Sequence, residues 1–126
     1  DVLGLSEEQI ASLTLGFGGG IGRLRLTCGA VSGMVFVVGA VFSNAQDTGN
    51  KLKVYEHVRN VCDKFKTETG SLICSELLSG VGINAEIGGT PEKRTAEYYK
   101  KRPCGNIVYN AAVILEEYLQ ELGIKC

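Results

Sequence analysis

Apolar residues recur every three or four positions along most of the chain, and strict alternation is nearly absent. One such stripe lies in residues 51–69: Val54, Val58, Val61, Cys62 and Phe65. A second lies in residues 104–122: Val108, Ala111, Leu115, Tyr118 and Leu122. This spacing is typical of amphipathic helices rather than of strands. The sequence therefore predicts an all-α protein.

Residues suited to helix termini set the expected helix boundaries. Ser6, Thr27 and Ser71 each precede a helical pattern as candidate N-caps, and Thr90-Pro91 adds proline at the first helical position. Pro103 is expected to end one helix and open the last. The expected helices cover about 28–45, 51–69, 72–78 and 104–122, besides one after Ser6 and one after Thr90. We predict a compact bundle of five to six helices in a single domain, residues 1–126.

The helix expected at about residues 28–45 is the most apolar of the chain, and a glycine-rich loop precedes it. Five of the seven residues 16–22 are glycine. The nearly uncharged stretch 29–44 has internal glycines and is shorter than the roughly 20 apolar residues that span a bilayer. We therefore expect no membrane span but a central helix, buried on most sides, which in so small a chain also makes a homodimer plausible.

Composition narrows the classes of function. The net charge of −1 gives no overall positive field, so we expect no nucleic-acid partner. Five cysteines are an odd number and form no CxxC pair, which argues against a fully paired secreted framework, a zinc ribbon and a thioredoxin motif. We expect a cytoplasmic protein. The chain begins at Asp1, so we also expect truncation at the N-terminus, and export stays open.

Three cysteines share one kind of position. Cys28, Cys74 and Cys104 are each expected in the first turn of a helix, where free amides and the helix dipole favour negative charge. Such positions lower a thiol pKa and favour a reactive thiolate or a metal ligand. Cys62 lies in an apolar stripe and is expected in the core. Cys126, the last residue, is expected to be a bystander.

Small residues surround the first of these cysteines. Gly29 and Gly33 are four apart on one helical face, with Ala30 between them, and small side chains let a backbone or cofactor approach closely. Tight helix packing is the alternative. The glycine-rich loop fits neither GxGxxG nor the P-loop pattern. We expect its backbone, including Gly20 and Gly22, to lie against the cysteine site or simply to form a turn.

Charged residues near these motifs are weaker candidates. Arg23 and Arg25 could present charge to an anion, although exposed loop arginines are more common. His57 is the only histidine and is expected at the edge of the core. A basic cluster is expected to be a solvated helix face, with docking of an acidic redox partner as the weaker alternative: Lys93, Arg94, Lys100, Lys101 and Arg102.

The order of these motifs resembles the C-GCAxxG-C-C family. It comprises the run Gly16–Arg23, the motif Cys28-Gly29-Ala30-Val31-Ser32-Gly33, Cys74, and Cys104 before the final helix. Members of this family are small prokaryotic proteins described as redox-active because they share four cysteines. The resemblance implies that Cys28, Cys74 and Cys104 are three of these four, whereas Cys62 and Cys126 do not match. The family's first cysteine, in an upstream Asn-Cys-Ala segment, has no counterpart here.

Three hypotheses follow for the function. In the first, two of the three thiols cycle between dithiol and disulfide with an unknown redox partner, protein or small molecule, and the third resolves the intermediate. In the second, the same cysteines bind a metal, either zinc or an iron–sulfur cluster. In the third, the chain is a structural helical module with inert cysteines. Both functional hypotheses require Cys28, Cys74 and Cys104 to lie together, and whether the protein is an enzyme stays open.

Overall fold

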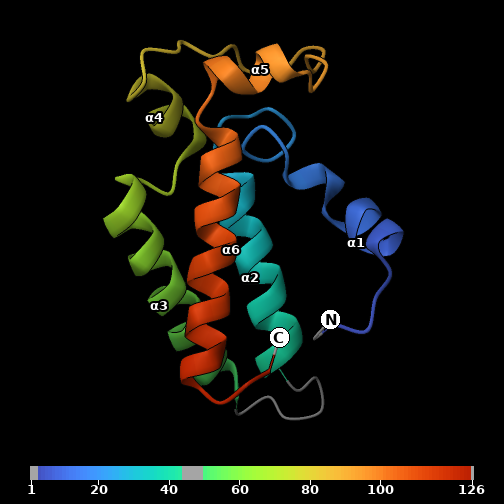
Figure 1. Cartoon of the computed structure of the whole chain (residues 1–126), viewed down its shortest axis with the longest axis vertical. Helices are drawn as coiled ribbons and strands as arrows, with labels where there is room; N and C mark the ends of the chain where they lie inside the picture. The colour runs from blue at the N-terminus through green and yellow to red at the C-terminus, as the bar shows by residue number, and fades with distance from the viewer. Residues whose placement is uncertain (1–2, 44–49, 126) are drawn as a thin grey trace.

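The computed structural model describes residues 3–43 and 50–125. Within them lie six α-helices and one 3₁₀ helix, and no strand longer than an isolated bridge (Figure 1). In chain order they are α1 (Glu7–Thr14), η1 (Leu15–Phe17), α2 (Gly29–Phe42), α3 (Lys51–Thr69), α4 (Cys74–Ser79), α5 (Ala96–Lys101) and α6 (Cys104–Glu121). The predicted all-α class is confirmed. Cys126 and most of the polar turn expected after α2 lie outside the described residues.

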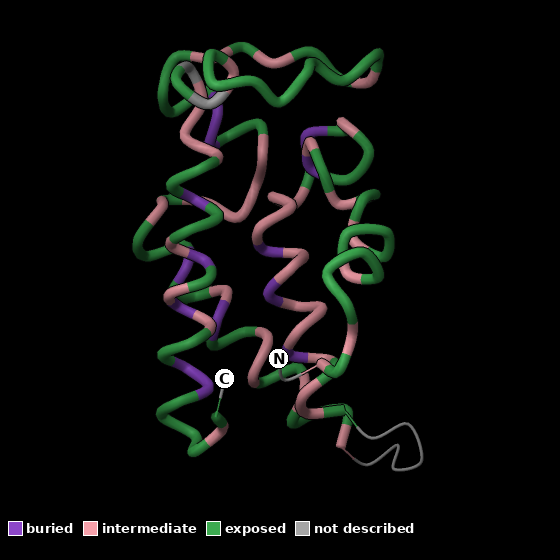
Figure 2. The backbone as a smooth tube through the Cα atoms, turned by 45° about the vertical axis from the view of Figure 1, so that its right-hand side comes forward, coloured by how far each residue is buried: buried purple, intermediate pink, exposed green. Residues whose placement is uncertain are grey.

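The long helices α2, α3 and α6 pack on one another and form the core (Figures 1 and 2). Their buried side chains are Val31, Met34, Val38, Val61, Phe65, Ile107, Ala111, Ile114 and Tyr118. Full burial of a large apolar side chain contributes about 1.5–3 kcal/mol, so these contacts hold the three helices together. In the described part of the chain, no helix combines the length and hydrophobicity needed to cross a membrane.

Two expectations about buried faces were wrong in part. Helix α2 is not buried on most sides, because only Val31, Met34 and Val38 are fully buried and the others are half-buried or exposed. Val108 of α6 and Leu122, which follows the helix, are exposed, and α6 buries neighbouring apolar residues instead. Apolar side chains surround much of α6, so the pattern alone did not decide which of them face the core.

Helix α1 starts as its sequence predicts. The Ser6 hydroxyl accepts a hydrogen bond from the Gln9 amide at 3.1 Å, and the Gln9 side chain accepts one from the Ser6 amide at 2.9 Å. This reciprocal capping box satisfies two amides that a helix N-terminus otherwise leaves free. The last turn continues into η1, which contacts α2.

The predicted caps Thr27 and Ser71 were wrong. The N-cap of α2 is Cys28 and that of α4 is Ile73. Thr27 and Ile73 pair across an isolated antiparallel bridge, which keeps both segments extended beyond the expected starts. Cys74 is therefore the first residue of α4.

No helix begins at Thr90-Pro91, contrary to the prediction. Helix α5 starts five residues later, where the Thr95 hydroxyl caps it by accepting from the Tyr98 amide. The preceding loop is held by distant contacts: the Gly88 amide donates to the Arg23 carbonyl at 2.9 Å. These tertiary contacts outweigh the capping preference of Thr90-Pro91. Helix α5 itself lies across the end of the bundle, near the start of α6 (Figure 1).

Candidate functional site: a cavity lined by three thiols

The glycine-rich loop forms a left-handed turn. All five residues 19–23 have positive φ, between 55° and 72°. A left-handed backbone costs a residue with a Cβ about 1–2 kcal/mol. Ile21 and Arg23 carry this cost, and the three glycines do not. Hydrogen bonds across the turn close it, among them the one from the Leu26 amide to the Gly20 carbonyl at 2.9 Å.

This turn lays its backbone directly against the second cysteine. A Cβ placed on Gly20 would lie 2.6 Å from the Cβ of Cys74 and 2.7 Å from the amide nitrogen of Leu26. Only glycine fits this contact. Gly22, by contrast, has no atom within 4 Å of a Cβ position and does not line the cavity described below.

The isolated bridge brings two of the cysteines to one place. The Cys28 amide donates to the Leu72 carbonyl at 2.8 Å, and the Cys74 amide donates to the Leu26 carbonyl at 2.6 Å. The residues next to the Thr27–Ile73 pair project to the face opposite that pair, because side chains alternate along extended chain. Cys28 and Cys74 therefore share a face where α2 and α4 begin.

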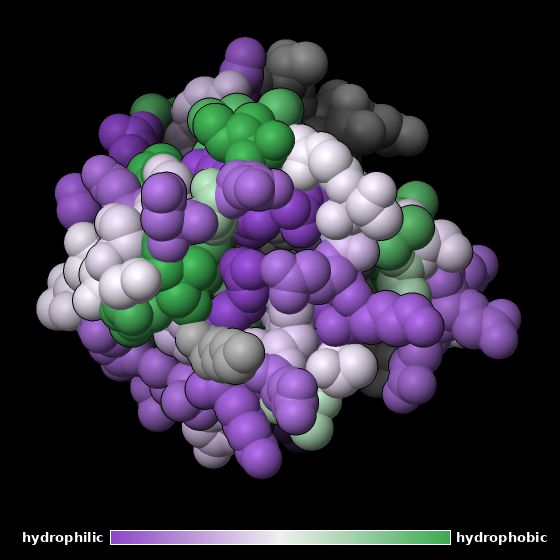
Figure 3. Space-filling model, turned by 90° about the horizontal axis from the view of Figure 1, so that it is seen from above, coloured by the Kyte–Doolittle hydropathy of each residue, from purple (hydrophilic) through white to green (hydrophobic). Residues whose placement is uncertain are grey.

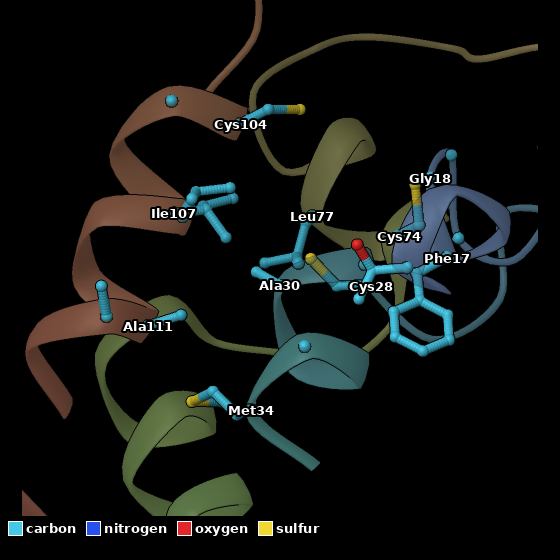
Figure 4. A pocket seen from close by; sticks show the side chains of 18 of the residues that line it. Phe17, Gly18, Cys28, Ala30, Met34, Cys74, Leu77, Cys104, Ile107 and Ala111 are labelled. Atoms are coloured by element: carbon cyan, nitrogen blue, oxygen red, sulfur yellow. The ribbon is translucent and has the colours of Figure 1, made fainter. Parts of the chain in front are cut away.

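A cavity of about 940 Å³ opens beside these cysteines. Its walls come from α1 with η1, the glycine-rich loop, α2, α4 and α6, and Figure 4 shows Cys28, Cys74 and Cys104 bordering it. Most of the lining is apolar and includes Ile10, Phe17, Val37, Leu77, Val108 and Leu115. The three cysteines predicted from helix N-termini thus line one cavity.

The structure places the other predicted residues as follows. Gly20, Gly29, Ala30 and Gly33 all line the cavity. Cys62 packs against the core and is absent from the cavity lining. The four described cysteines are free: Cys28, Cys62, Cys74 and Cys104.

The environment of Cys28 differs from the expected one. Burial raises the pKa of this thiol. The backbone amides of Ala30 and Val31 lower the pKa, but by less than burial raises it. The Cys28 side chain makes no capping hydrogen bond to α2. The neighbouring Cys74 and Cys104 raise the pKa further. The helix N-terminus therefore acts as expected, but it does not produce a low pKa at Cys28.

Cys104 shows the same balance. Burial raises the pKa of its thiol first, and Cys74 adds to the rise, whereas Arg102 and Arg94 lower it without reversing the shift. The mutual effects among the cysteines reflect the cost of placing several thiolates in one cavity.

Arg25 was expected to be exposed, and this was wrong. Only 5% of it is exposed, and its Nε donates to the Glu86 carbonyl at 2.9 Å. Its Nη1 also donates to the sulfur of Cys74 at 3.9 Å. In the described ranges the one ion pair joins Arg102 to Glu92, so no carboxylate there compensates the buried charge of Arg25. Its position three residues after the glycine-rich loop was the only signal in the sequence.

Two residues of the expected basic surface, Arg94 and Arg102, contact other side chains of the protein. The guanidinium groups of Arg94 and Arg102 lie 4.4 and 4.8 Å from the ring centre of Tyr98, and Arg102 pairs with Glu92 at 3.3 Å. Arg94 and Tyr98 also belong to the cavity lining. Seen from above, this end of the molecule is largely hydrophilic, with separate hydrophobic groups (Figure 3).

Two other candidates lie elsewhere. His57 stacks on Phe42, with ring centres 3.9 Å apart, and its Nδ1 is 2.7 Å from the Tyr118 hydroxyl. It does not line the cavity. Among residues 3–43 and 50–125, no three His, Cys, Asp or Glu side chains are placed to hold a metal ion. The three thiols border one cavity without converging on one point, so a metal would require them to move closer.

These features define a small helical protein in which cysteines from three helix N-termini line one apolar cavity. The chain belongs to the C_GCAxxG_C_C family: the family model described as "Putative redox-active protein (C_GCAxxG_C_C)" matches residues 1–118. The resemblance carried by the cysteine and glycine motifs is thereby confirmed. Among curated proteins and among solved structures, none matches the chain.

Proposed function

We propose that this protein exchanges two electrons through Cys28 and Cys74, which cycle between two thiols and one disulfide, with Cys104 as the third thiol of the site. On oxidation the two thiols lose two protons and two electrons and one S–S bond forms. The main support is the Thr27–Ile73 bridge, which places the starts of α2 and α4 next to each other with both cysteines on one face. On an antiparallel bridge these two residues are diagonal neighbours, about 7–8 Å apart, so formation of the disulfide requires the two helix starts to move closer. The family description agrees with this chemistry.

Cys74 is the thiol proposed to react first. The cationic Arg25 contacts its sulfur, and hydrogen bonds from a charged donor to an anionic acceptor are among the strongest in proteins. Burial raises the pKa of Cys28 and of Cys104, so these two stay protonated at neutral pH until they are attacked or deprotonated.

A metal or iron–sulfur centre is the second candidate, because three thiols rather than two line the cavity. Cys28, Cys74 and Cys104 would be the ligands, with one metal position left open. Such a centre would supply one-electron transfer or, with zinc, a Lewis acid.

The first experiment counts thiols in protein purified anaerobically, before and after mild oxidation. We expect a loss of two thiols per chain and a Cys28–Cys74 peptide pair by mass spectrometry. The Cys74→Ser variant should lose this change, whereas Cys62→Ala, altered outside the cavity, should keep it. An unchanged thiol count, or a disulfide through Cys62, would contradict the proposal. Stoichiometric iron, sulfide or zinc in the same sample would favour the metal centre.

A matched arginine pair tests the role of Arg25. Arg23 and Arg25 both have positive φ and both donate to carbonyls of the loop at residues 86–88, but only Arg25 reaches a cysteine sulfur. Arg25→Gln should slow iodoacetamide alkylation of Cys74 about 10-fold, because the sulfur loses its hydrogen bond from a charged donor. Arg23→Gln should leave the rate within two-fold, and equal rates in both variants would remove Arg25 from the mechanism.

A further inference from the structure

The cavity is larger than a disulfide exchange requires. Its volume of about 940 Å³ lies at the upper end of the range of about 300–1,000 Å³ typical of small-molecule sites. It extends from the cysteines past Met34 and Val37 of α2 and past Ala111 and Leu115 of α6. Two thiols reacting with each other would use only one end of this space.

Small side chains keep the cavity open. Ala30, Gly33 and Ala112 line it, and a Cβ on Gly33 would have no atom within 4 Å. On the opposite wall, Ile10 and Phe17 face the cavity, although α1 and η1 have no buried residue. Val108 lines it too and is 58% exposed. Apolar side chains from α1, η1, α2 and α6 thus border a space that no protein atom fills.

The charged groups of the lining are few. Arg25 lies next to the Cys74 sulfur, and Arg94 is the other charged residue of the lining. Arg25 is buried and has no carboxylate partner among the described residues, so it can donate to an oxygen of a bound molecule. The matching ligand has an apolar body and a hydrogen-bond-accepting oxygen at the end next to the thiols.

We propose that this cavity binds an apolar quinone and that the quinone is the electron acceptor for the Cys28–Cys74 pair. This inference rests on the dithiol function proposed above. The ring lies at the thiols with one carbonyl oxygen toward Arg25, and the apolar substituent lies between α1 and the α2–α6 wall. The two thiols transfer two electrons and two protons to the quinone, which becomes a hydroquinone while the S–S bond forms.

A protein disulfide fits this cavity less well. A peptide needs polar partners for its backbone, and the walls formed by α2 and α6 offer apolar side chains instead. Cys28, Cys74 and Cys104 are also only partly exposed, which restricts approach by a second polypeptide.

The test uses the reduced full chain under anaerobic conditions with duroquinone, whose ring has no free position for thiol addition. We expect saturable reduction of duroquinone, followed by ultraviolet absorbance, with loss of two thiols per chain. Gly33→Leu should fill the cavity and lower the second-order rate at least 10-fold. Gly39→Leu is the matched control: it lies in the same helix, also has no atom within 4 Å of its Cβ position, and does not line the cavity. Circular dichroism checks that both variants fold.

A small polar oxidant, hydroxyethyl disulfide, separates the two proposals. It should oxidise the wild type and the Gly39→Leu variant at rates within two-fold of each other, because it needs no apolar cavity. If it does so while duroquinone reacts without saturation, or equally with both variants, the quinone site is overturned and the dithiol function stands. If neither oxidant lowers the thiol count, the dithiol function fails and the quinone site fails with it.

Discussion

Glycine occupies three positions near the cysteines for three different physical reasons. Gly20 has φ of +72° and no room for a Cβ beside Cys74. Gly22 has φ of +55° but open space around it. Gly29 has an ordinary helical backbone, yet a Cβ there would lie 2.8 Å from the Phe17 carbonyl oxygen. The cost of replacing each glycine therefore depends on a different contact.

These differences predict unequal effects of the same substitution. Gly20→Ala should lower the free energy of unfolding by about 3 kcal/mol, because it combines left-handed strain with overlap against Cys74. Gly22→Ala should cost only about 1 kcal/mol, from the strain alone. Urea unfolding of the two variants measures both values. Equal losses would show that the close contact at Gly20 relaxes freely.

At the same scale, the sequence predicted the cysteine positions but not Arg25. Pro103 marks the helix start at Cys104 as predicted, whereas Cys28 and Cys74 lie at helix starts although their predicted caps, Thr27 and Ser71, were wrong. The burial of Arg25 depends on the left-handed course of residues 19–23, which turns its side chain toward Glu86 and Cys74. No local pattern gives that direction.

At the scale of elements, α1 is well capped but weakly packed. Its capping box is complete, yet none of its residues is buried, and η1 provides its connection to α2. Of its large apolar residues, Ile10 lines the cavity and Leu13 is exposed. Helical propensity and capping therefore account for more of the stability of α1 than tertiary packing does.

This balance predicts a local effect of the cap. Ser6→Ala should cost about 1 kcal/mol of helix stability, because the Gln9 amide loses its acceptor. Hydrogen exchange of the α1 amides should accelerate about 5-fold, whereas the α6 amides keep their protection. If the exchange of α6 accelerated equally, α1 would be part of the cooperative core.

Element boundaries were predictable where their causes are local. Helix α3 runs from Lys51 to Thr69 as predicted, and Gly70 ends it with φ of +96°. Helix α6 ends one residue before the expected Leu122. The predictions failed at Thr27 and at Thr90-Pro91, where pairing with distant segments decides the backbone conformation.

For the whole molecule, partial burial of the thiols links stability to pH. Burial raises the pKa of Cys28, Cys62 and Cys104 in the folded chain. The unfolded chain therefore releases these protons first as pH rises. The stabilisation is complete below the pKa of a free thiol, about 8.5, and is lost as pH rises through the folded-state values.

The reduced protein should accordingly become less stable between pH 7 and pH 9.5. Urea unfolding at several pH values under a reducing agent measures the slope. The Cys28→Ala/Cys104→Ala double variant should show a smaller slope, because two of the three thiols no longer titrate. The same slope in both proteins would mean that other groups cause the loss.

The contacts that build the site also join segments far apart in the chain. Arg25 reaches Glu86 and Cys74 across 61 and 49 positions, and Arg23 reaches Gly88 across 65. Closing such long loops is slow and entropically costly, so during folding these contacts form late. A newly made chain then has its helices before its thiols are enclosed. In that interval Cys28 and Cys74 are open to any oxidant in the surroundings, so the first redox event in the life of the molecule can precede its native structure.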